Sequence, residues 1–124
     1  MQEKFQIVYL SDADDFIASL PLKARAKILY NIKKSKFCSD PKLLKKLDGT
    51  DIWEFRTKFA GVQYRLLAFW DDRNETLVVA THGFVKKTQK TPKQEIERAE
   101  YLRSQYFNKQ NGKNENIHGR RNAG

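Results

Sequence analysis

Apolar residues recur along the chain in patterns that predict one strand, two helices, three further strands and a last helix. The apolar run from Phe5 to Leu10 predicts a strand buried largely on both faces. A short acidic helix is expected after Ser11, and Pro21 begins a second helix, because proline suits the first helical turn. The second helix carries lysines on one side and one apolar stripe at helical spacing on the other: Leu22, Ala26, Leu29 and Ile32.

The middle of the chain predicts an antiparallel meander. Residues from Ile52 to Phe59 alternate between apolar and charged, which is typical of a strand with one buried face. Ala60-Gly61 supplies a turn, and Val62–Trp70 returns as a strongly apolar strand. A third strand is expected to start near Thr76, to pass through His82 and to give way to a basic loop.

A last helix is predicted from Pro92 to about Phe107. Strands and helices are therefore segregated along the chain, which indicates an α+β fold. Residues 1–107 fit one folded domain. Residues 108–124 lack apolar periodicity and are predicted to be a disordered basic tail.

The turn at Ala60-Gly61 determines which residues of the hairpin share a face. A two-residue loop pairs Phe59 with Val62 and places Arg56 opposite Arg65; a loop shifted by one residue would pair Lys58 with Arg65 instead. In either register one face is apolar, and the other holds Arg56, Lys58, Gln63 and Arg65. The apolar face is expected to be the core, with the basic face outward.

Opposed like charges cost up to about 1 kcal/mol, so an anion is expected between these cations. A bound phosphate is one such anion. The alternative is that Glu54 and nearby acids neutralise the cluster.

Composition adds a strong positive charge to this picture. The formal net charge is +9, and residues 1–107 contain 20 of the 24 cationic and 14 of the 15 acidic side chains. This excess favours a polyanionic partner such as nucleic acid. The single cysteine excludes an internal disulfide, and no Cys and His pair has metal-ligand spacing. Neither a signal peptide nor a long apolar run is visible, so we expect a soluble cytoplasmic protein without metal or cofactor.

His82 and the lysines that follow it are candidates for phosphate chemistry. Cleavage of RNA without a metal needs a base for the 2′-hydroxyl, cations for the phosphorane and an acid for the departing 5′-oxygen. Histidine and lysines of lowered pKa transfer protons, and arginine contacts phosphate in a bidentate manner. The residue types that suit these roles are present: Arg56, Lys58, Arg65, His82, Lys86 and Lys87. A lone histidine at the end of a strand is more often structural, and Lys90 with its neighbours also suits a solvated loop.

Two segments carry a resemblance to a known family. The sequence IWEFRTKFAGVQYRLLAF, with HGFVKKTQKTPKQEIERA after it, closely resembles the phage-derived HigB-like branch of the RelE/ParE toxin superfamily. The resemblance extends from about Lys4 to Phe107 and implies the same order of strands and helices. It implies the toxin of a type II toxin–antitoxin system, a metal-independent endoribonuclease that cleaves mRNA on the ribosome.

The resemblance also implies roles for individual residues. Arg65 would hold the scissile phosphate, and Arg56 and Lys58 would contact RNA or assist proton transfer. His82 and Lys86 would take part in catalysis at the basic end of the strand. RNA or ribosome binding would extend to Lys87, Lys90, Lys45 and Lys46. No clear equivalent of a C-terminal catalytic tyrosine is present, and the implied partner is a helix-turn-helix, HigA-like antitoxin.

Two other functions stay open on the same fold. One is a gyrase inhibitor like ParE, which the cluster of Arg56, Lys58, Arg65 and His82 disfavours. The other is a non-catalytic module that binds nucleic acid or only its antitoxin.

Overall fold

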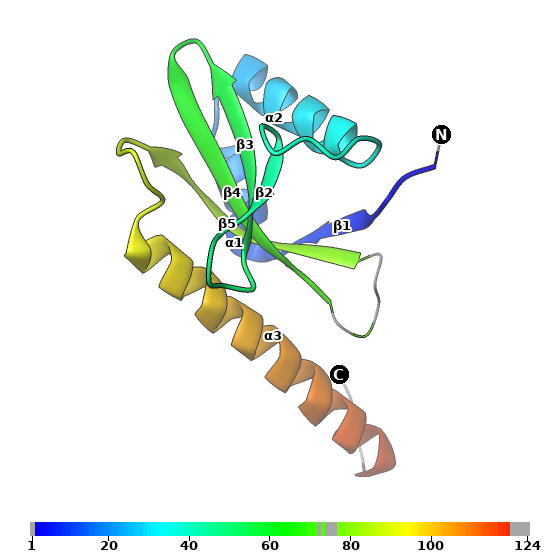
Figure 1. Ribbon diagram of the computed structural model, residues 1–124. Coiled ribbons are helices and arrows are strands. Elements are labelled where there is room, and N and C mark those ends of the chain that lie inside the picture. The colour runs from blue at the N-terminus through cyan, green and yellow to red at the C-terminus, as the bar shows by residue number, and fades with distance from the viewer. Residues whose placement is uncertain (1, 72, 74–76, 120–124) are drawn as a thin grey trace.

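In the computed structural model, five strands form one sheet that is flanked by three helices (Figure 1). The structure describes residues 2–71, 73 and 77–119, with side chains described up to Lys109. The elements follow the chain in this order: β1 (Gln6–Tyr9), α1 (Ser11–Ala18), α2 (Leu22–Ser35), β2 (Leu44–Lys46), β3 (Trp53–Phe59), β4 (Val62–Trp70), β5 (Leu77–Lys86) and α3 (Lys93–Gly119). The predicted α+β class is confirmed.

The strand order in the sheet is β1-β5-β4-β3-β2. β1 pairs with β5 in parallel, and the other neighbours are antiparallel. The short strand β2 was not predicted, since its three residues lie in a segment without apolar alternation. It pairs only with Trp53–Phe55, so the second half of β3 forms a free edge of the sheet.

The β3–β4 hairpin has the predicted two-residue turn. Ala60 and Gly61 have φ values of 51° and 80°, as expected for a tight turn that matches strand twist. Phe59 pairs with Val62, and Arg56 lies opposite Arg65. The first of the two predicted registers is therefore the observed one.

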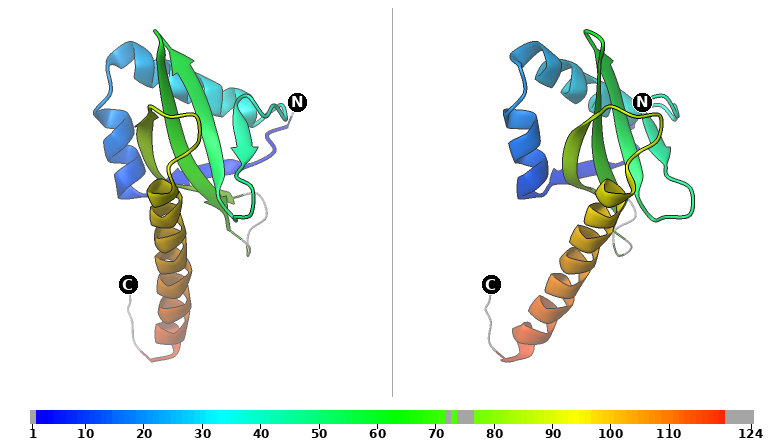
Figure 2. Two further views of the ribbon diagram at one scale, coloured as in Figure 1. Left: turned by 60° about the vertical axis from the view of Figure 1, so that its left-hand side comes forward. Right: turned by 90° about the vertical axis from the view of Figure 1, so that its left-hand side faces the viewer.

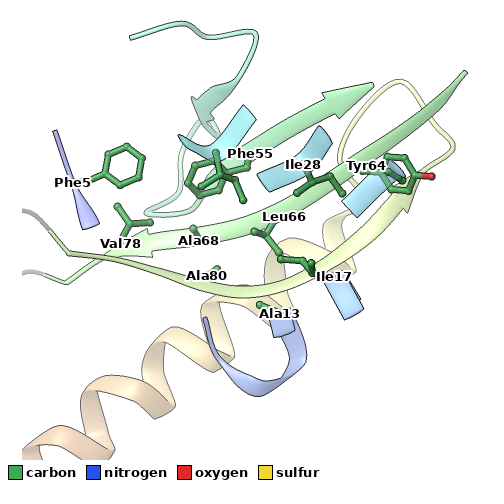
Figure 3. Close-up of a cluster of buried hydrophobic side chains, with 12 residues drawn as sticks. Phe5, Ala13, Ile17, Ile28, Phe55, Tyr64, Leu66, Ala68, Val78 and Ala80 are labelled. Carbon is green, nitrogen blue, oxygen red and sulfur yellow. The ribbon is translucent and has the colours of Figure 1, made fainter. Parts of the chain in front are cut away.

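Both faces of the sheet are buried, each by different helices. Figure 3 shows the larger cluster, in which side chains of the strands, including Phe55 and Leu66, pack with Ile17 of α1 and Ile28 of α2. On the other face Leu67, Phe69 and Val79 pack against Ala99 of α3. Figure 2 shows that α1 and α2 lie beside the sheet, whereas α3 extends away from it.

Two predictions about individual elements need correction. Of the stripe predicted for α2, Ile32 is buried, but Leu22 is 74% exposed and Ala26 and Leu29 are also exposed. The reason is that Ala24 and Ile28, one or two positions away from these residues, lie with Ile32 on the side of the helix that meets the sheet. β5 does not end near His82 but continues to Lys86. Its predicted start, Thr76, lies outside the described residues.

The last helix is longer than expected. α3 continues to Gly119, past the predicted end near Phe107, so part of the predicted tail is helical. Residues 120–124 of that tail lie outside the described part of the chain. The division of the chain at residue 107 stays a prediction.

Candidate functional site

A basic recess opens along the free edge of β3. It has a volume of about 870 Å³ and lies between α2, the segment that precedes β2, and the hairpin end of the sheet. Eight cationic side chains line it: Lys27, Lys34, Lys42, Arg56, Lys58, Arg65, Lys86 and Lys87. No acidic side chain is among its lining residues in the described part of the chain. Such a recess attracts anions, since like charges around one hollow add their fields.

The fold explains how these cations meet. Arg56 and Lys58 alternate along β3, and the pairing with β4 sets Arg65 and Gln63 directly beside them. Lys86 is brought in from β5, where it pairs with Gln63. The spacing of four and three residues places Lys27, Asn31 and Lys34 on one side of α2, and Asn31 Nδ2 donates a hydrogen bond to Thr57 Oγ1 at 3.1 Å. This buried link holds the lysines of α2 against β3.

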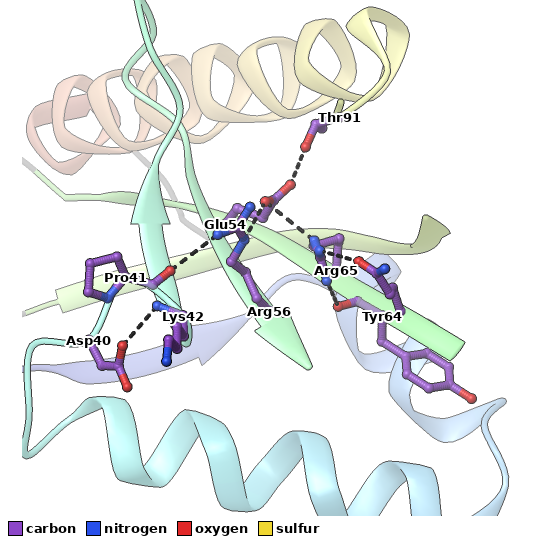
Figure 4. Close-up of polar contacts among 9 residues, drawn as sticks. Asp40, Pro41, Lys42, Glu54, Arg56, Tyr64, Arg65 and Thr91 are labelled. Atoms are coloured by element: carbon purple, nitrogen blue, oxygen red, sulfur yellow. Dashed lines mark hydrogen bonds and ion pairs between the residues drawn. The ribbon is translucent and has the colours of Figure 1, made fainter. Parts of the chain in front are cut away.

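Glu54 does not line the recess, but it is buried beside it and contacts two of its arginines (Figure 4). Its Oε1 is 3.1 Å from Arg56 Nε and 3.4 Å from Arg65 Nε. Its Oε2 accepts a hydrogen bond from the Thr91 hydroxyl. Glu54 is fully buried, so this carboxylate neutralises part of the charge where Arg56 and Arg65 oppose each other. The alternative considered from the sequence, neutralisation by Glu54, is thus what the structure shows for these two arginines.

Arg65 is held more firmly than the sequence suggested. Its side chain is only 7% exposed, which corrects the expectation that the whole basic face points outward. Nη1 donates to the Tyr64 carbonyl at 3.1 Å and Nη2 donates to Gln63 Oε1 at 2.7 Å. Burial lowers the pKa of Arg65, and the attraction of Glu54 partly offsets this. Nη1 and Nη2 each have a second N–H group besides the one that makes these bonds.

Lys86 is a lysine of the recess with a lowered pKa. Burial lowers its pKa, and repulsion from Arg65, Arg56 and Lys45 lowers it further, while Glu54 acts in the opposite direction. A lowered pKa makes the amine a better proton carrier near neutral pH. Arg56 is partly exposed and also donates from Nη1 to the Pro41 carbonyl at 3.3 Å.

His82 is in the structure but not in the recess. It lies within β5, is 1% exposed, and both ring nitrogens have partners: Thr81 Oγ1 lies 3.1 Å from Nδ1 and Glu95 Oε1 lies 3.0 Å from Nε2. A bulge at Thr81, which lies between the pairs Leu67–His82 and Ala68–Ala80, points His82 toward α3. Burial lowers the pKa of His82, although the hydrogen bond that His82 makes to the Glu95 carboxylate raises it. Its catalytic role stays a prediction, and the geometry favours a structural one.

The other predicted lysines divide into two groups. Lys87 lines the recess beside Lys86, whereas Lys90 is exposed in the loop before α3 and does not line it. Lys45 and Lys46 are exposed on β2 and line a second cavity instead. Sequence reasoning placed Gln63 on the basic face of the hairpin, but it did not place Asn31 or Thr57 in the site. Helical spacing was the signal that could have predicted that one side of α2 lines the recess, since it places Lys27, Asn31 and Lys34 on the same side of the helix.

Comparisons with known proteins agree with this fold. The profile of the family described as phage derived protein Gp49-like matches residues 15–104. The chain belongs to this family.

Solved structures with a similar fold are known for this Gp49-like chain. It is similar to a mutant of the E. coli toxin RelE in the free state, at 17% identity and a TM-score of 0.57, over 82% of this chain and 98% of that one. It is also similar to the intact E. coli RelBE toxin–antitoxin complex, at 17% identity and a TM-score of 0.49, over 69% of this chain and 99% of that one. No curated protein sequence matches the chain. The predicted resemblance to a phage-derived branch with the RelE fold is confirmed.

Among the described residues of this Gp49-like chain, no three His, Cys, Asp or Glu side chains form a group that could hold a metal ion. None of the described helices is both long and apolar enough to cross a membrane.

Proposed function

We propose that this protein is the toxin of a toxin–antitoxin pair and acts as an endoribonuclease that cleaves mRNA on the ribosome. The observation that carries the proposal is the basic recess, in which eight cations and no acid line one hollow at the edge of the sheet. An RNA backbone is the polyanion that such a hollow suits, because phosphates supply most of the affinity in nucleic-acid binding. The RelE fold and the phage-derived family are consistent with this function.

The reaction is an internal transfer at phosphorus. The 2′-oxygen forms a bond to the phosphorus, the bond to the 5′-oxygen breaks, and the products carry a 2′,3′-cyclic phosphate and a 5′-hydroxyl. One proton leaves the 2′-hydroxyl and one is delivered to the 5′-oxygen, so the step consumes no water and needs no metal. Cations that surround the phosphate stabilise the extra negative charge of the transition state.

We infer which residues perform these tasks from their positions in the recess. Arg56 and Arg65 would hold the phosphate, because they lie opposite each other and are oriented by Glu54. Lys86, whose pKa is lowered, would transfer a proton, and Lys58 and Lys87 would bind the neighbouring phosphates. Lys45, Lys46 and Lys90 would contact RNA or ribosome outside the recess. Such substrates would place the protein in the cytoplasm.

The antitoxin would bind at the same surface. A helix-turn-helix protein of the HigA type, with an acidic segment, would neutralise the recess and exclude RNA from it. The charge of the lining supports an acidic partner segment, since burial of unpaired cations alone is costly.

The test is cleavage of a translated mRNA by wild type and by the Lys86→Gln variant. Loss of one acid–base group slows such reactions by about 10²- to 10⁴-fold, and we expect a decrease in that range. Lys109→Gln is the matched control, because Lys109 is exposed on α3 and does not line the recess. Intact mRNA with the folded wild-type protein would refute the proposal. Blocked DNA supercoiling in the same extract would instead identify a gyrase inhibitor.

A further inference from the structure

A second cavity, of about 420 Å³, lies between the residues that precede β1, the short strand β2, the start of β3, the end of β4 and the end of α2. Its walls are mostly apolar and include Phe5, Leu44, Trp53 and Trp70. The volume is within the range of sites for small molecules, roughly 300–1,000 Å³. Nothing in the proposed cleavage reaction uses this cavity.

The aromatic rings of the cavity are fixed in orientation. Trp70 packs edge-to-face with Phe5, with ring centroids 5.5 Å apart and planes at 80°. Trp53 packs edge-to-face with Trp70 at 6.2 Å and 79°. Both tryptophans are partly exposed, so a planar ligand would meet a preformed aromatic wall.

The rim of the cavity is positively charged. Lys4, Lys45 and Lys46 line it, against Asp40 as the one acidic lining residue. In the described part of the chain none of these three lysines forms an ion pair with a carboxylate; Lys4 Nζ donates to Ser39 Oγ at 2.8 Å. Aromatic walls with a cationic rim suit a ligand that is planar and apolar in one part and anionic in another.

The cavity is continuous with the basic recess along the chain. Lys42 and Leu43 line the recess, and the next residues, Leu44 to Lys46, line the cavity. Lys45 of the cavity is also near enough to Lys86 of the recess to repel its charge. A strand of nucleic acid whose phosphates lie in the recess can therefore extend toward the cavity. This combination of a cationic track and aromatic side chains is how proteins hold single strands by base stacking.

We propose that this cavity binds an unpaired base of the RNA strand, with the adjoining phosphate held by Lys45 and Lys46. The base stacks on the ring of Trp53 and meets Trp70 edge-on, since the two ring planes lie at 79°. The inference rests on the proposed function for the identity of the strand. It adds a subsite that binds base rather than phosphate. The subsite would position the RNA relative to the cations of the recess.

The two tryptophans offer a direct test, because they are the only ones in the chain and both line the cavity. The probe is a short single-stranded DNA, which lacks the 2′-hydroxyl and is not cleaved. We expect saturable quenching of the tryptophan fluorescence by this DNA. An abasic oligonucleotide of the same length should bind without quenching, since it has phosphates but no bases.

Variants localise the effect. Trp53→Leu should weaken binding of the DNA by about 5- to 150-fold, the range expected for loss of one stacking partner. Lys46→Glu changes an exposed side chain and should also weaken it, whereas Lys109→Glu changes charge elsewhere and should have a smaller effect. If Trp53→Leu does not fold, two other measurements test whether DNA occupies the cavity. One is the affinity of Lys46→Glu for the DNA, and the other is the alkylation rate of Cys38. Cys38 is the single cysteine and lines the cavity, so bound DNA should slow its reaction with iodoacetamide.

The outcomes separate this inference from the proposed function. DNA binding that Lys86→Gln weakens, but that neither quenches the tryptophans nor depends on Lys46, would overturn the base subsite and leave the recess intact. Quenching by an antitoxin but not by DNA would also overturn it and assign the cavity to a protein partner. Base-dependent quenching without mRNA cleavage would support the subsite and refute the nuclease.

Discussion

Glu54 and Arg65 form an ion pair at 3.4 Å between two side chains that are 1% and 7% exposed. The pair joins adjacent strands, and Arg56 completes it from the opposite side at 3.1 Å. Two arginines that would repel each other across β3 and β4 are therefore held by one buried carboxylate. The same contacts that stabilise the sheet orient the arginines toward the recess.

Glu54→Gln should destabilise the protein strongly. Loss of one partner of a buried ion pair leaves an uncompensated charge, and such changes cost about 3–5 kcal/mol in the free energy of unfolding. Arg56 is partly exposed and can turn to solvent, but Arg65 cannot. Urea unfolding of wild type and variant measures the difference. A decrease below about 1 kcal/mol would mean that the pair contributes little to stability.

Much of the fold is predictable because the strands carry strong local signals. Alternation in β3, the apolar run of β4 and the Ala60-Gly61 turn together determine the hairpin register. In α2 the predicted stripe was right at Ile32 and wrong at Leu22, Ala26 and Leu29, because these residues match helical spacing as well as the buried Ala24 and Ile28 do. Only the position of the sheet decides between the two stripes.

The site was predictable in its cations but not in its arrangement. The pairing of Arg56 with Arg65 follows from the turn at Ala60-Gly61. Lys86 and Lys87 were candidates because they follow His82 closely in the sequence, and both line the recess. That His82 lies apart from the recess could not be predicted, because it depends on the extra length of β5 and on the bulge at Thr81.

His82 should make stability depend on pH on the acid side. Its pKa is lowered in the folded state from the ordinary value of 6.5, chiefly by burial. Below pH 6.5 the unfolded chain therefore binds a proton that the folded chain excludes. The stabilisation is present above pH 6.5 and is lost as the pH falls toward the lowered pKa. Urea unfolding between pH 7.5 and 5.5 should show a steeper loss for wild type than for His82→Gln.

The same variant decides the catalytic role predicted from the sequence. Because His82 does not line the recess, His82→Gln should still cleave mRNA when measured under conditions where it is fully folded. Loss of cleavage by about 10²-fold or more in the folded variant would restore histidine as a proton carrier. Circular dichroism on the same samples establishes that the variant is folded.

Gly83 should not tolerate a side chain, for a reason of packing. A Cβ at this position would lie 2.1 Å from Cδ2 of Phe16, so α1 packs directly on the backbone of β5. Gly83→Ala should lower the free energy of unfolding by about 1–3 kcal/mol, as overpacking does. Phe16→Leu in the same chain removes part of the ring and should recover part of the loss. Additive effects in this double-mutant cycle would contradict the contact.

Tyr106 should contribute to stability and not to cleavage. Its hydroxyl donates to Asp71 Oδ2 at 2.7 Å, and its ring packs edge-to-face with Phe69 on the α3 side of the sheet. Tyr106→Phe should lower the free energy of unfolding by about 1–3 kcal/mol, because a hydrogen bond to a charged group is lost. It should leave mRNA cleavage unchanged, since Tyr106 does not line the recess.

The raised pKa of the Tyr106 phenol should also be observable at alkaline pH. Burial and the Asp71 carboxylate raise the pKa of Tyr106 to about 12 from the ordinary 10. Between these values the unfolded chain loses the phenolic proton while the folded chain keeps it, so this stabilisation is present below pH 10 and is lost as the pH rises toward 12. Burial also raises the pKa of Tyr9, and the charge of Asp14 adds to this. Absorbance titration of the tyrosinates should therefore show a loss of late-titrating absorbance in Tyr106→Phe, while the contribution of Tyr9 stays. A titration near pH 12 that is unchanged in Tyr106→Phe would contradict the assignment, and a folded Tyr106→Phe that fails to cleave mRNA would make this residue part of the active site.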